Sequence, residues 1–200
     1  MPGGAVAGGK GPGHPARLSP YDAPVSLWDP LAALPPVADD PRLRAAVLVP
    51  LYESDGGLRT VLTRRPDDMR THGGDVVFPG GMIDPADSGP VGTALREAWE
   101  EVGIPPDRVE VLGGLEPLTT RSREMWIAPV VARIRRPAVL HPEPGEVEAI
   151  IEPMLADLLD DRAWESRDWD GHQMWFYEFP EGVLWGATAR MVRQLLEYFR

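Results

Sequence analysis

This 200-residue chain lacks cysteine and long apolar runs, and it has few basic residues. It contains no cysteine, which excludes disulfide bridges, thiolate metal sites and cysteine nucleophiles. Basic residues are scarce: 20 Lys and Arg against 31 Asp and Glu give a formal net charge of −11. Nucleic acids and anionic membranes bind to basic surfaces, so we expect neither as a partner. No apolar run approaches the roughly 20 residues that a membrane-spanning helix needs.

The N-terminus also lacks the apolar stretch of a signal peptide, because prolines and glycines interrupt it throughout. Together with the missing cysteines, this leads us to expect a cytoplasmic protein. The sequence leaves a monomer and a homodimer equally open, since the aromatic segment 174–179 ("MWFYEF") suits either a core or an interface.

The composition divides the chain into three parts. Proline and glycine are so frequent in residues 1–26 that we expect a flexible tail there. Residues 27–41 are expected to form a linker with a possible short helix in "SLWDPLAAL". Residues 42–200 are long enough to form one domain with a sizeable core.

Within that domain, strand-like and helix-like patterns follow one another without regular alternation. This predicts an α+β fold in which helices cover both faces of a mixed sheet. Helices are expected at residues 90–102, 152–160 and 186–199, and strands at 44–52, 58–65, 74–81, 108–118, 125–134 and 172–179.

The helix expected at residues 90–102 carries an unusual cluster of charge. Helical periodicity places Glu97, Glu100 and Glu101 in one sector, beside the apolar face that packs on the sheet. Arg96 lies one turn before Glu100 and is expected to pair with it. An acidic face in contact with water is the simplest explanation. However, three carboxylates that converge from one turn also form the oxygen-only ligand set that Mg²⁺ or Mn²⁺ prefers.

The stretch from Gly81 through "REAWEEVGI", residues 96–104, resembles the Nudix box, a Gly, a Glu and then Arg-Glu-apolar-x-Glu-Glu-x-Gly-apolar. The second half matches at every specified position. In the first half, the spacing from Gly81 to Arg96 is one residue longer than usual, and Ser88 stands where the box has Glu. Asp84 and Asp87 lie nearby.

Residues 61–84 ("VLTRRPDDMRTHGGDVVFPGGMID") are similar to a second motif, found in the coenzyme A diphosphatase branch of the Nudix hydrolases. Asp75 stands where Gln is usual, while the longer box without its first Glu is typical of this branch. The C-terminal "WFYEFPEGVLWGATARMV" also resembles the closing segment of the branch. The residues that match the second motif are Leu62, Thr63, Arg65, Met69, Arg70, His72, Gly74, Phe78, Pro79, Gly80 and Gly81.

The side chains of this second motif suit a phosphorylated substrate. Arg64, Arg65, Arg70 and His72 are concentrated just ahead of the glycine pair in an otherwise acidic chain, and guanidinium groups bind phosphate in a bidentate manner. Each Arg could instead be a plain surface charge, and His72 could bridge loop carbonyls.

The glycine pair itself has two explanations. Gly80 and Gly81 allow either a close approach of the backbone to a ligand or a simple tight turn.

The resemblance implies a metal-dependent hydrolase that cleaves the diphosphate of coenzyme A or acyl-CoA to 3′,5′-ADP and (acyl-)4′-phosphopantetheine. Glu97, Glu100 and Glu101 would hold Mg²⁺ or Mn²⁺, which activates the attacking water. Glu146 in "PGEVEAI" is a candidate general base, although Glu146 and Glu148 also fit ordinary solvent-facing positions.

Two other functions remain open at this stage. A Nudix hydrolase that acts on ADP-ribose or NADH would contain the box, but it would not be expected to contain the second motif. A non-catalytic Nudix domain used for ligand sensing would be expected to lose box glutamates, and all three are present.

Overall fold

The computed structural model describes residues 26–69, 73–119, 125–137, 139–169 and 171–200. The expected tail, apart from Ser26, lies outside these residues, and so do Arg70 and His72, two of the predicted substrate-binding residues. The other site residues predicted from the sequence are all described.

A mixed sheet of six strands forms the centre of the molecule. Its long strands β1 and β8 run parallel to each other, and every other pairing in the sheet is antiparallel, with the order β2-β1-β8-β6. β5 also pairs with β1, and β7 with β8. The strands are β1 (Leu43–Ser54), β2 (Gly57–Thr60), β5 (Gly80–Met82), β6 (Val109–Gly114), β7 (Leu118–Thr119) and β8 (Trp126–Ile134).

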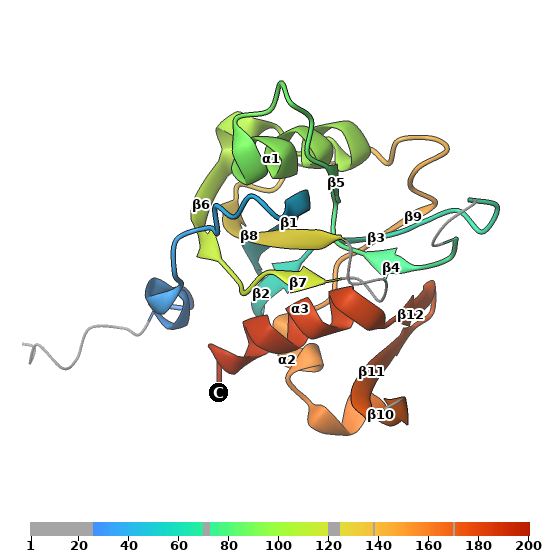
Figure 1. Ribbon diagram of the computed structural model, residues 1–200. Coiled ribbons are helices and arrows are strands. Elements are labelled where there is room, and N and C mark those ends of the chain that lie inside the picture. Colours follow the sequence, from blue (N-terminus) through green and yellow to red (C-terminus); the bar gives the residue numbers. More distant parts are fainter. Residues whose placement is uncertain (1–25, 70–72, 120–124, 138, 170) are drawn as a thin grey trace, which may run out of the picture.

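Two three-stranded sheets extend the structure beyond this centre. One has the order β4-β3-β9, and the other is the meander β10-β11-β12 near the C-terminus (Figure 1). Their strands are β3 (Leu62–Arg64), β4 (Val76–Val77), β9 (Ala149–Ile151), β10 (Trp164–Trp169), β11 (His172–Phe179) and β12 (Gly182–Leu184).

Several strand predictions need correction. The single strands expected at residues 58–65, 74–81 and 108–118 are each divided in two, and each part of the first two pairs in a different sheet. In the second case Pro79 lies at the division, and its carbonyl accepts a hydrogen bond from the Leu48 amide. Three strands, β9, β10 and β12, were not predicted from the sequence at all. β10 is exposed along nearly its whole length, so its sequence has no apolar alternation.

The helices match the predicted positions more closely. The helices are α1 (Gly89–Val102), α2 (Leu155–Leu158) and α3 (Gly186–Glu197), with single 3₁₀ turns η1 (Asp29–Ala33), η2 (Pro106–Arg108) and η3 (Asp161–Ala163). α1 ends at Gly103, whose left-handed backbone lets the amides of residues 103 and 104 bond back to the last turn. Ser88 occupies the N-cap position, but its side chain makes no capping hydrogen bond.

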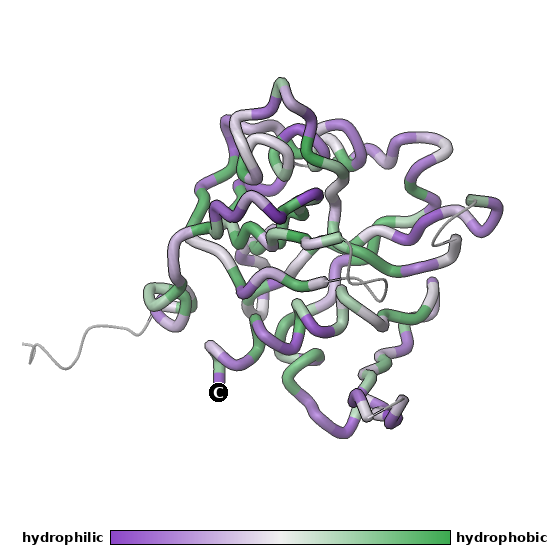
Figure 2. Tube along the Cα trace, in the orientation of Figure 1, coloured by the Kyte–Doolittle hydropathy of each residue, from purple (hydrophilic) through white to green (hydrophobic). Residues whose placement is uncertain are grey.

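Helices cover both faces of the central sheet, which confirms the predicted α+β sandwich. α1 lies on one face, and α3 lies with α2 on the other (Figure 1). Side chains of β1 alternate between the two cores: Leu48 packs with the apolar face of α1, whereas Val49 packs with α3. Figure 2 shows the hydrophobic segments gathered in these interior layers.

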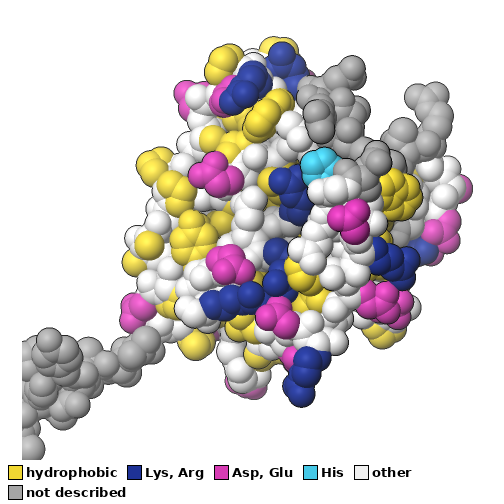
Figure 3. Space-filling model, turned by 60° about the horizontal axis from the view of Figure 1, so that its bottom comes forward, with side chains coloured by type: hydrophobic (Ala, Val, Ile, Leu, Met, Phe, Trp, Pro, Cys, Tyr) yellow, Lys and Arg dark blue, Asp and Glu magenta, His cyan; other side chains and the backbone are white. Residues whose placement is uncertain are grey.

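The surface carries both signs of charge. On the face in Figure 3, acidic and basic side chains are interspersed and form no continuous basic area among the residues drawn in colour. Among the described residues, no helix is both long and apolar enough to cross a membrane.

The segment before β1 is tied to the domain at two points. Leu31, in η1, is 3% exposed and belongs to the core on the α3 side. Farther along, the Pro35 carbonyl accepts a hydrogen bond of 2.9 Å from the Gly114 amide at the end of β6.

This packing can be tested with a matched pair of substitutions. Leu31→Ala removes a buried side chain and is expected to lower the free energy of unfolding by about 2–4 kcal/mol. Leu27→Ala, at a side chain that is 49% exposed, is expected to change it by less than about 0.5 kcal/mol. Urea denaturation measures both, and equal stability of the two variants would contradict the docking of η1.

Candidate functional site

The predicted acidic cluster lies on α1, on the flank of the helix that faces β5. Ala94, Ala98 and Val102 are fully buried and fix the rotation of the helix on the sheet. This rotation gives the three glutamates very different surroundings. The side chain of Glu100 is 53% exposed and that of Glu97 is 15% exposed, whereas residue Glu101 is 4% exposed.

Arg96 is the common partner of this cluster. One of its terminal nitrogens, Nη1, lies 2.9 Å from Glu97 Oε1 and 2.9 Å from Glu100 Oε2. The pairing expected between Arg96 and Glu100 is therefore present. Arg96 also binds Asp87 with two hydrogen bonds, Nε to Oδ1 at 3.0 Å and Nη2 to Oδ2 at 3.1 Å. One guanidinium thus balances three carboxylates.

Asp87 is the residue of this cluster to which the sequence analysis gave no role. Its side chain is buried, and it also accepts hydrogen bonds from Thr93 Oγ1 and from the Asp84 amide. The bidentate hydrogen bond from Arg96 holds the pKa of Asp87 well below its usual range. The sequence did contain a sign of this role. Ser88 occupies the position where the box has Glu, and the extra residue in the box places an acid, Asp87, one position earlier.

Glu101 is nearly enclosed, and a backbone amide holds it in place. The Gly80 N–H donates to Glu101 Oε2 at 3.1 Å. The pKa of Glu101 is raised to about 7, mainly by burial. The charges of Glu97 and Glu146 also raise this pKa, whereas the Gly80 hydrogen bond and the charge of Arg65 lower it. Burial also raises the pKa of Glu97. For both carboxylates, the effect of burial on the pKa therefore outweighs that of the nearby positive charge.

Close approach explains both glycines before the loop to α1. A Cβ on Gly80 would lie 2.5 Å from the Ala46 carbonyl oxygen of β1, and a Cβ on Gly81 would collide with the Glu97 carboxylate. Neither residue has a positive φ angle, so left-handed conformation is not the reason for glycine here.

The two neighbouring arginines Arg64 and Arg65 have different partners. Arg64 forms ion pairs with Asp67, at 2.6 Å, and with Glu148. The Nε atoms of both arginines are buried without a hydrogen-bond partner. The two differ in where their charge acts: the terminal nitrogens of Arg64 pair with carboxylates, whereas the charge of Arg65 lowers the pKa of Glu101. Of these two predicted substrate-binding residues, Arg65 is therefore the one that acts on the acidic cluster.

The predicted general base, Glu146, is also brought to this place. It is exposed, and its charge raises the pKa of both Glu97 and Glu101. The loop that carries it is attached to the end of α1, because the amides of His141 and Glu143 donate to the carbonyls of Val102 and Glu101.

The fit of this cluster to a divalent cation rests on its donor chemistry. Glu97, Glu100 and Glu101 offer only oxygen atoms as ligands. The half-buried Glu97 and the buried Glu101 have raised pKa values that an added cation would lower. Within the part of the chain that the structure describes, no group of three His, Cys, Asp or Glu side chains has the arrangement needed to hold a metal ion. One oxygen each of Glu97 and Glu100 is held by Arg96 instead, so metal binding by these residues stays a prediction.

Asp87→Asn tests the role of Arg96 as the common partner. Losing hydrogen bonds to a charged group is expected to lower the free energy of unfolding by about 1.5–3 kcal/mol at pH 7. Because the folded-state pKa of Asp87 is lowered, its stabilising effect is full above the unfolded value of about 3.9 and is lost as the pH falls below it. The stability difference between wild type and variant should therefore shrink below about pH 4.

Asp84→Asn is the control, since Asp84 is an exposed acid in the same loop whose Oδ1 accepts only the Ala86 amide. Urea denaturation over a pH series measures both variants. A pH-independent difference for Asp87→Asn would contradict the ionic pairing.

Curated relatives share a large part of this chain. "Uncharacterized Nudix hydrolase NudL" of Photorhabdus laumondii is 38% identical over 162 residues, which cover 79% of this chain and 86% of the relative. "Nudix hydrolase 15, mitochondrial" of Arabidopsis thaliana is 36% identical over 172 residues, 78% of this chain and 60% of that protein, so this chain matches less than two thirds of the plant relative.

A solved structure and a family model agree with the fold. The NUDIX domain of Shewanella oneidensis NrtR, solved in complex with ADP ribose, aligns with a TM-score of 0.53 at 20% identity and covers 81% of this chain and 94% of that one. The model of the NUDIX domain matches residues 42–180. The chain therefore belongs to the Nudix family and is a Nudix hydrolase, an enzyme that acts on a nucleoside diphosphate derivative.

Proposed function

We propose that this Nudix hydrolase cleaves the diphosphate of coenzyme A or an acyl-CoA to 3′,5′-ADP and (acyl-)4′-phosphopantetheine. The observation that supports the proposal is that residues of both motifs interact with Glu101. Gly80 and Arg65, which match the motif of the coenzyme A diphosphatase branch, both act on this glutamate of the Nudix box.

Nudix hydrolases generally use divalent metals such as Mg²⁺ or Mn²⁺, and here Glu97, Glu100 and Glu101 would hold the ion. When bound, the cation neutralises the diphosphate and lowers the pKa of a coordinated water. Arg96 orients Glu97 and Glu100, and Asp87 holds Arg96 in place.

The remaining steps fall to two other side chains. The guanidinium of Arg65, a half-buried side chain beside Glu101, donates to a phosphate oxygen, an interaction that guanidinium groups make strongly. Glu146 accepts the proton of the attacking water while the water oxygen bonds to phosphorus and the bridging P–O bond breaks. Its exposure and its closeness to Glu97 and Glu101 support this role.

ADP-ribose is the main competing substrate. The NrtR domain that shares this fold is complexed with ADP ribose, although 20% identity supports the fold alone. The motif at residues 62–81 favours coenzyme A. Mass spectrometry separates the two possibilities, since coenzyme A yields 3′,5′-ADP and ADP-ribose yields AMP and ribose 5-phosphate.

Glu101→Gln and Glu97→Gln test the metal half of the site. With coenzyme A and Mg²⁺ or Mn²⁺, we expect kcat to fall by orders of magnitude in either variant, because each loses a charged ligand. Chelation by EDTA should abolish turnover of the wild type, and added metal should restore it. Formation of 3′,5′-ADP, followed by mass spectrometry, is the measurement. Turnover near the wild-type rate in Glu101→Gln would rule out the assignment.

Glu146→Gln and Glu148→Gln form a matched pair for the general base. Loss of a general base is expected to lower kcat about 10²- to 10⁴-fold. Glu148 lies on the same loop but is paired with Arg64, so its variant should keep kcat within about 3-fold. Steady-state kinetics with coenzyme A gives both values, and equal effects would remove Glu146 from the mechanism.

A further inference from the structure

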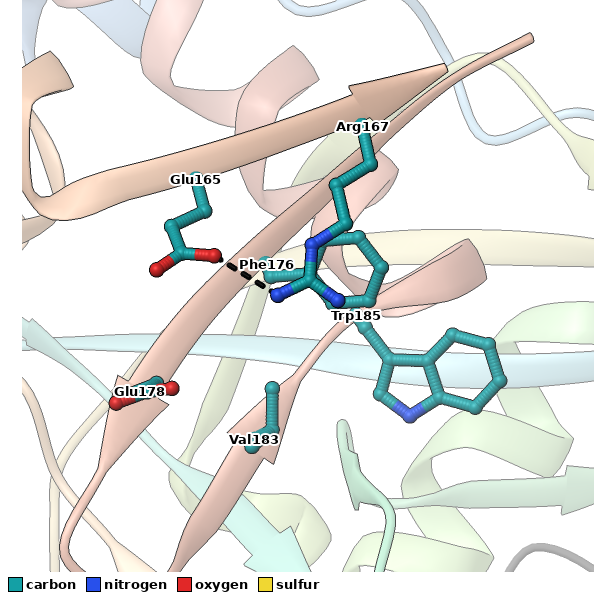
Figure 4. Close-up of a pocket in the computed structure, with 6 residues that line it drawn as sticks. All are labelled: Glu165, Arg167, Phe176, Glu178, Val183 and Trp185. Atoms are coloured by element: carbon teal, nitrogen blue, oxygen red, sulfur yellow. Dashed lines mark hydrogen bonds and ion pairs between the residues drawn. The ribbon is translucent and has the colours of Figure 1, made fainter. Parts of the chain in front are cut away.

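A cavity of about 340 Å³ opens on the outer face of the β10–β12 sheet. Its lining comes from alternate residues of three neighbouring strands and the residue after the last of them, so all six side chains share one side of the sheet. Figure 4 shows Arg167 above Phe176, with Trp185 beside them. The lining residues are Glu165, Arg167, Phe176, Glu178, Val183 and Trp185.

The cavity presents flat aromatic surfaces. The rings of Phe176 and Trp185 are parallel to within 7°, with centroids 6.5 Å apart, and the Arg167 guanidinium lies 4.9 Å from the Phe176 centroid. Trp185 is 40% exposed, so part of its ring is accessible to a ligand. Exposed aromatic and guanidinium planes together are typical of sites that bind a nucleobase by stacking.

The charged groups of the cavity narrow the choice of ligand. Glu178 is exposed, and Glu165 is paired with Arg167 at 3.0 Å. Two carboxylates repel a phosphate and accept hydrogen bonds from an exocyclic amine. An open cavity rimmed by charge is also a poor site for an acyl chain. A neutral planar base with an amino group, such as adenine, fits both the flat surfaces and the carboxylates.

A short chain of hydrogen bonds links this cavity to the candidate active site. Trp185 Nε1 donates to Asp75 Oδ1 at 2.9 Å, and the Asp75 carbonyl accepts the Arg65 amide at 3.0 Å. The start of β12 also lies close to this segment, since a Cβ on Gly182 would lie 3.3 Å from Arg64 Nε. The segment that carries Arg65 therefore borders both sites.

We propose that this cavity is the subsite for the adenine base of the nucleotide substrate. The inference rests on the proposed function for its link to catalysis, but it is common to coenzyme A and ADP-ribose because both contain adenine. Trp185 supplies the stacking surface, and Glu178 accepts hydrogen bonds from the amino group.

Calorimetric titration of the full chain with AMP, IMP and UMP tests the subsite directly. We expect AMP to bind at least about 5-fold more tightly than IMP, which lacks the amino group, or UMP, which has the smaller ring. Trp185→Ala should weaken AMP binding about 5- to 100-fold, and Trp185→Phe, which keeps a stacking ring, should stay within about 3-fold of the wild type. If Trp185→Ala does not fold, Phe176→Leu, which removes the other aromatic ring of the cavity, tests the same effect on AMP binding.

Trp169→Ala is the matched control, because Trp169 is an exposed tryptophan of the same sheet that does not line the cavity. It should leave AMP binding unchanged. In turnover of coenzyme A, Trp185→Ala should raise KM and leave kcat within about 3-fold.

The outcomes separate this inference from the proposed function. Binding of AMP that depends on Trp185, in a protein that does not cleave coenzyme A, would support the subsite and overturn only the substrate assignment. The protein could instead cleave coenzyme A but fail to bind AMP, or bind AMP with equal losses in Trp185→Ala and Trp169→Ala. Either result would overturn the subsite alone.

Discussion

The candidate active site depends on one guanidinium among carboxylates. Arg96 contacts Asp87, Glu97 and Glu100, and it joins the loop before α1 to the functional face of that helix. Without it, these acids would repel one another in a chain that already carries a net charge of −11. Because Arg96 is held by Asp87 in a fixed geometry, it positions Glu97 and Glu100 instead of only balancing their charge.

Glu101 shows how close packing shapes this chemistry. Gly80 and Gly81 allow β5 to approach β1 on one side and α1 on the other, with no room for a Cβ at either position. Glu101 is therefore enclosed, its pKa rises to about 7, and the Gly80 amide holds one of its oxygens. A carboxylate in such surroundings is suited to a positively charged ligand, which is the condition that a divalent cation would meet.

The proposed substrate needs more than one contact area, and the fold offers two. The acidic cluster and Arg65 suit a diphosphate, while the aromatic cavity on the β10–β12 sheet suits a base. The C-terminal strands, which lie far from the Nudix box in the sequence, are brought next to its neighbouring motif by the contact between Trp185 and Asp75. This arrangement would let sequence changes in the C-terminal sheet alter substrate preference without touching the acidic cluster.

The sequence by itself determined the features that follow from local periodicity. The position of α1, its rotation, the shared face of its glutamates and the pairing of Arg96 with Glu100 all follow from 3.6 residues per turn. Only the tertiary structure decided that Asp87 and not residue 88 holds Arg96. It also decided that Arg64 pairs with two carboxylates while the charge of Arg65 acts on Glu101, and that Glu146 lies beside Glu97 and Glu101. These relations join loops with no repeating pattern, and their side chains meet through the packing of distant strands, which no local signal encodes.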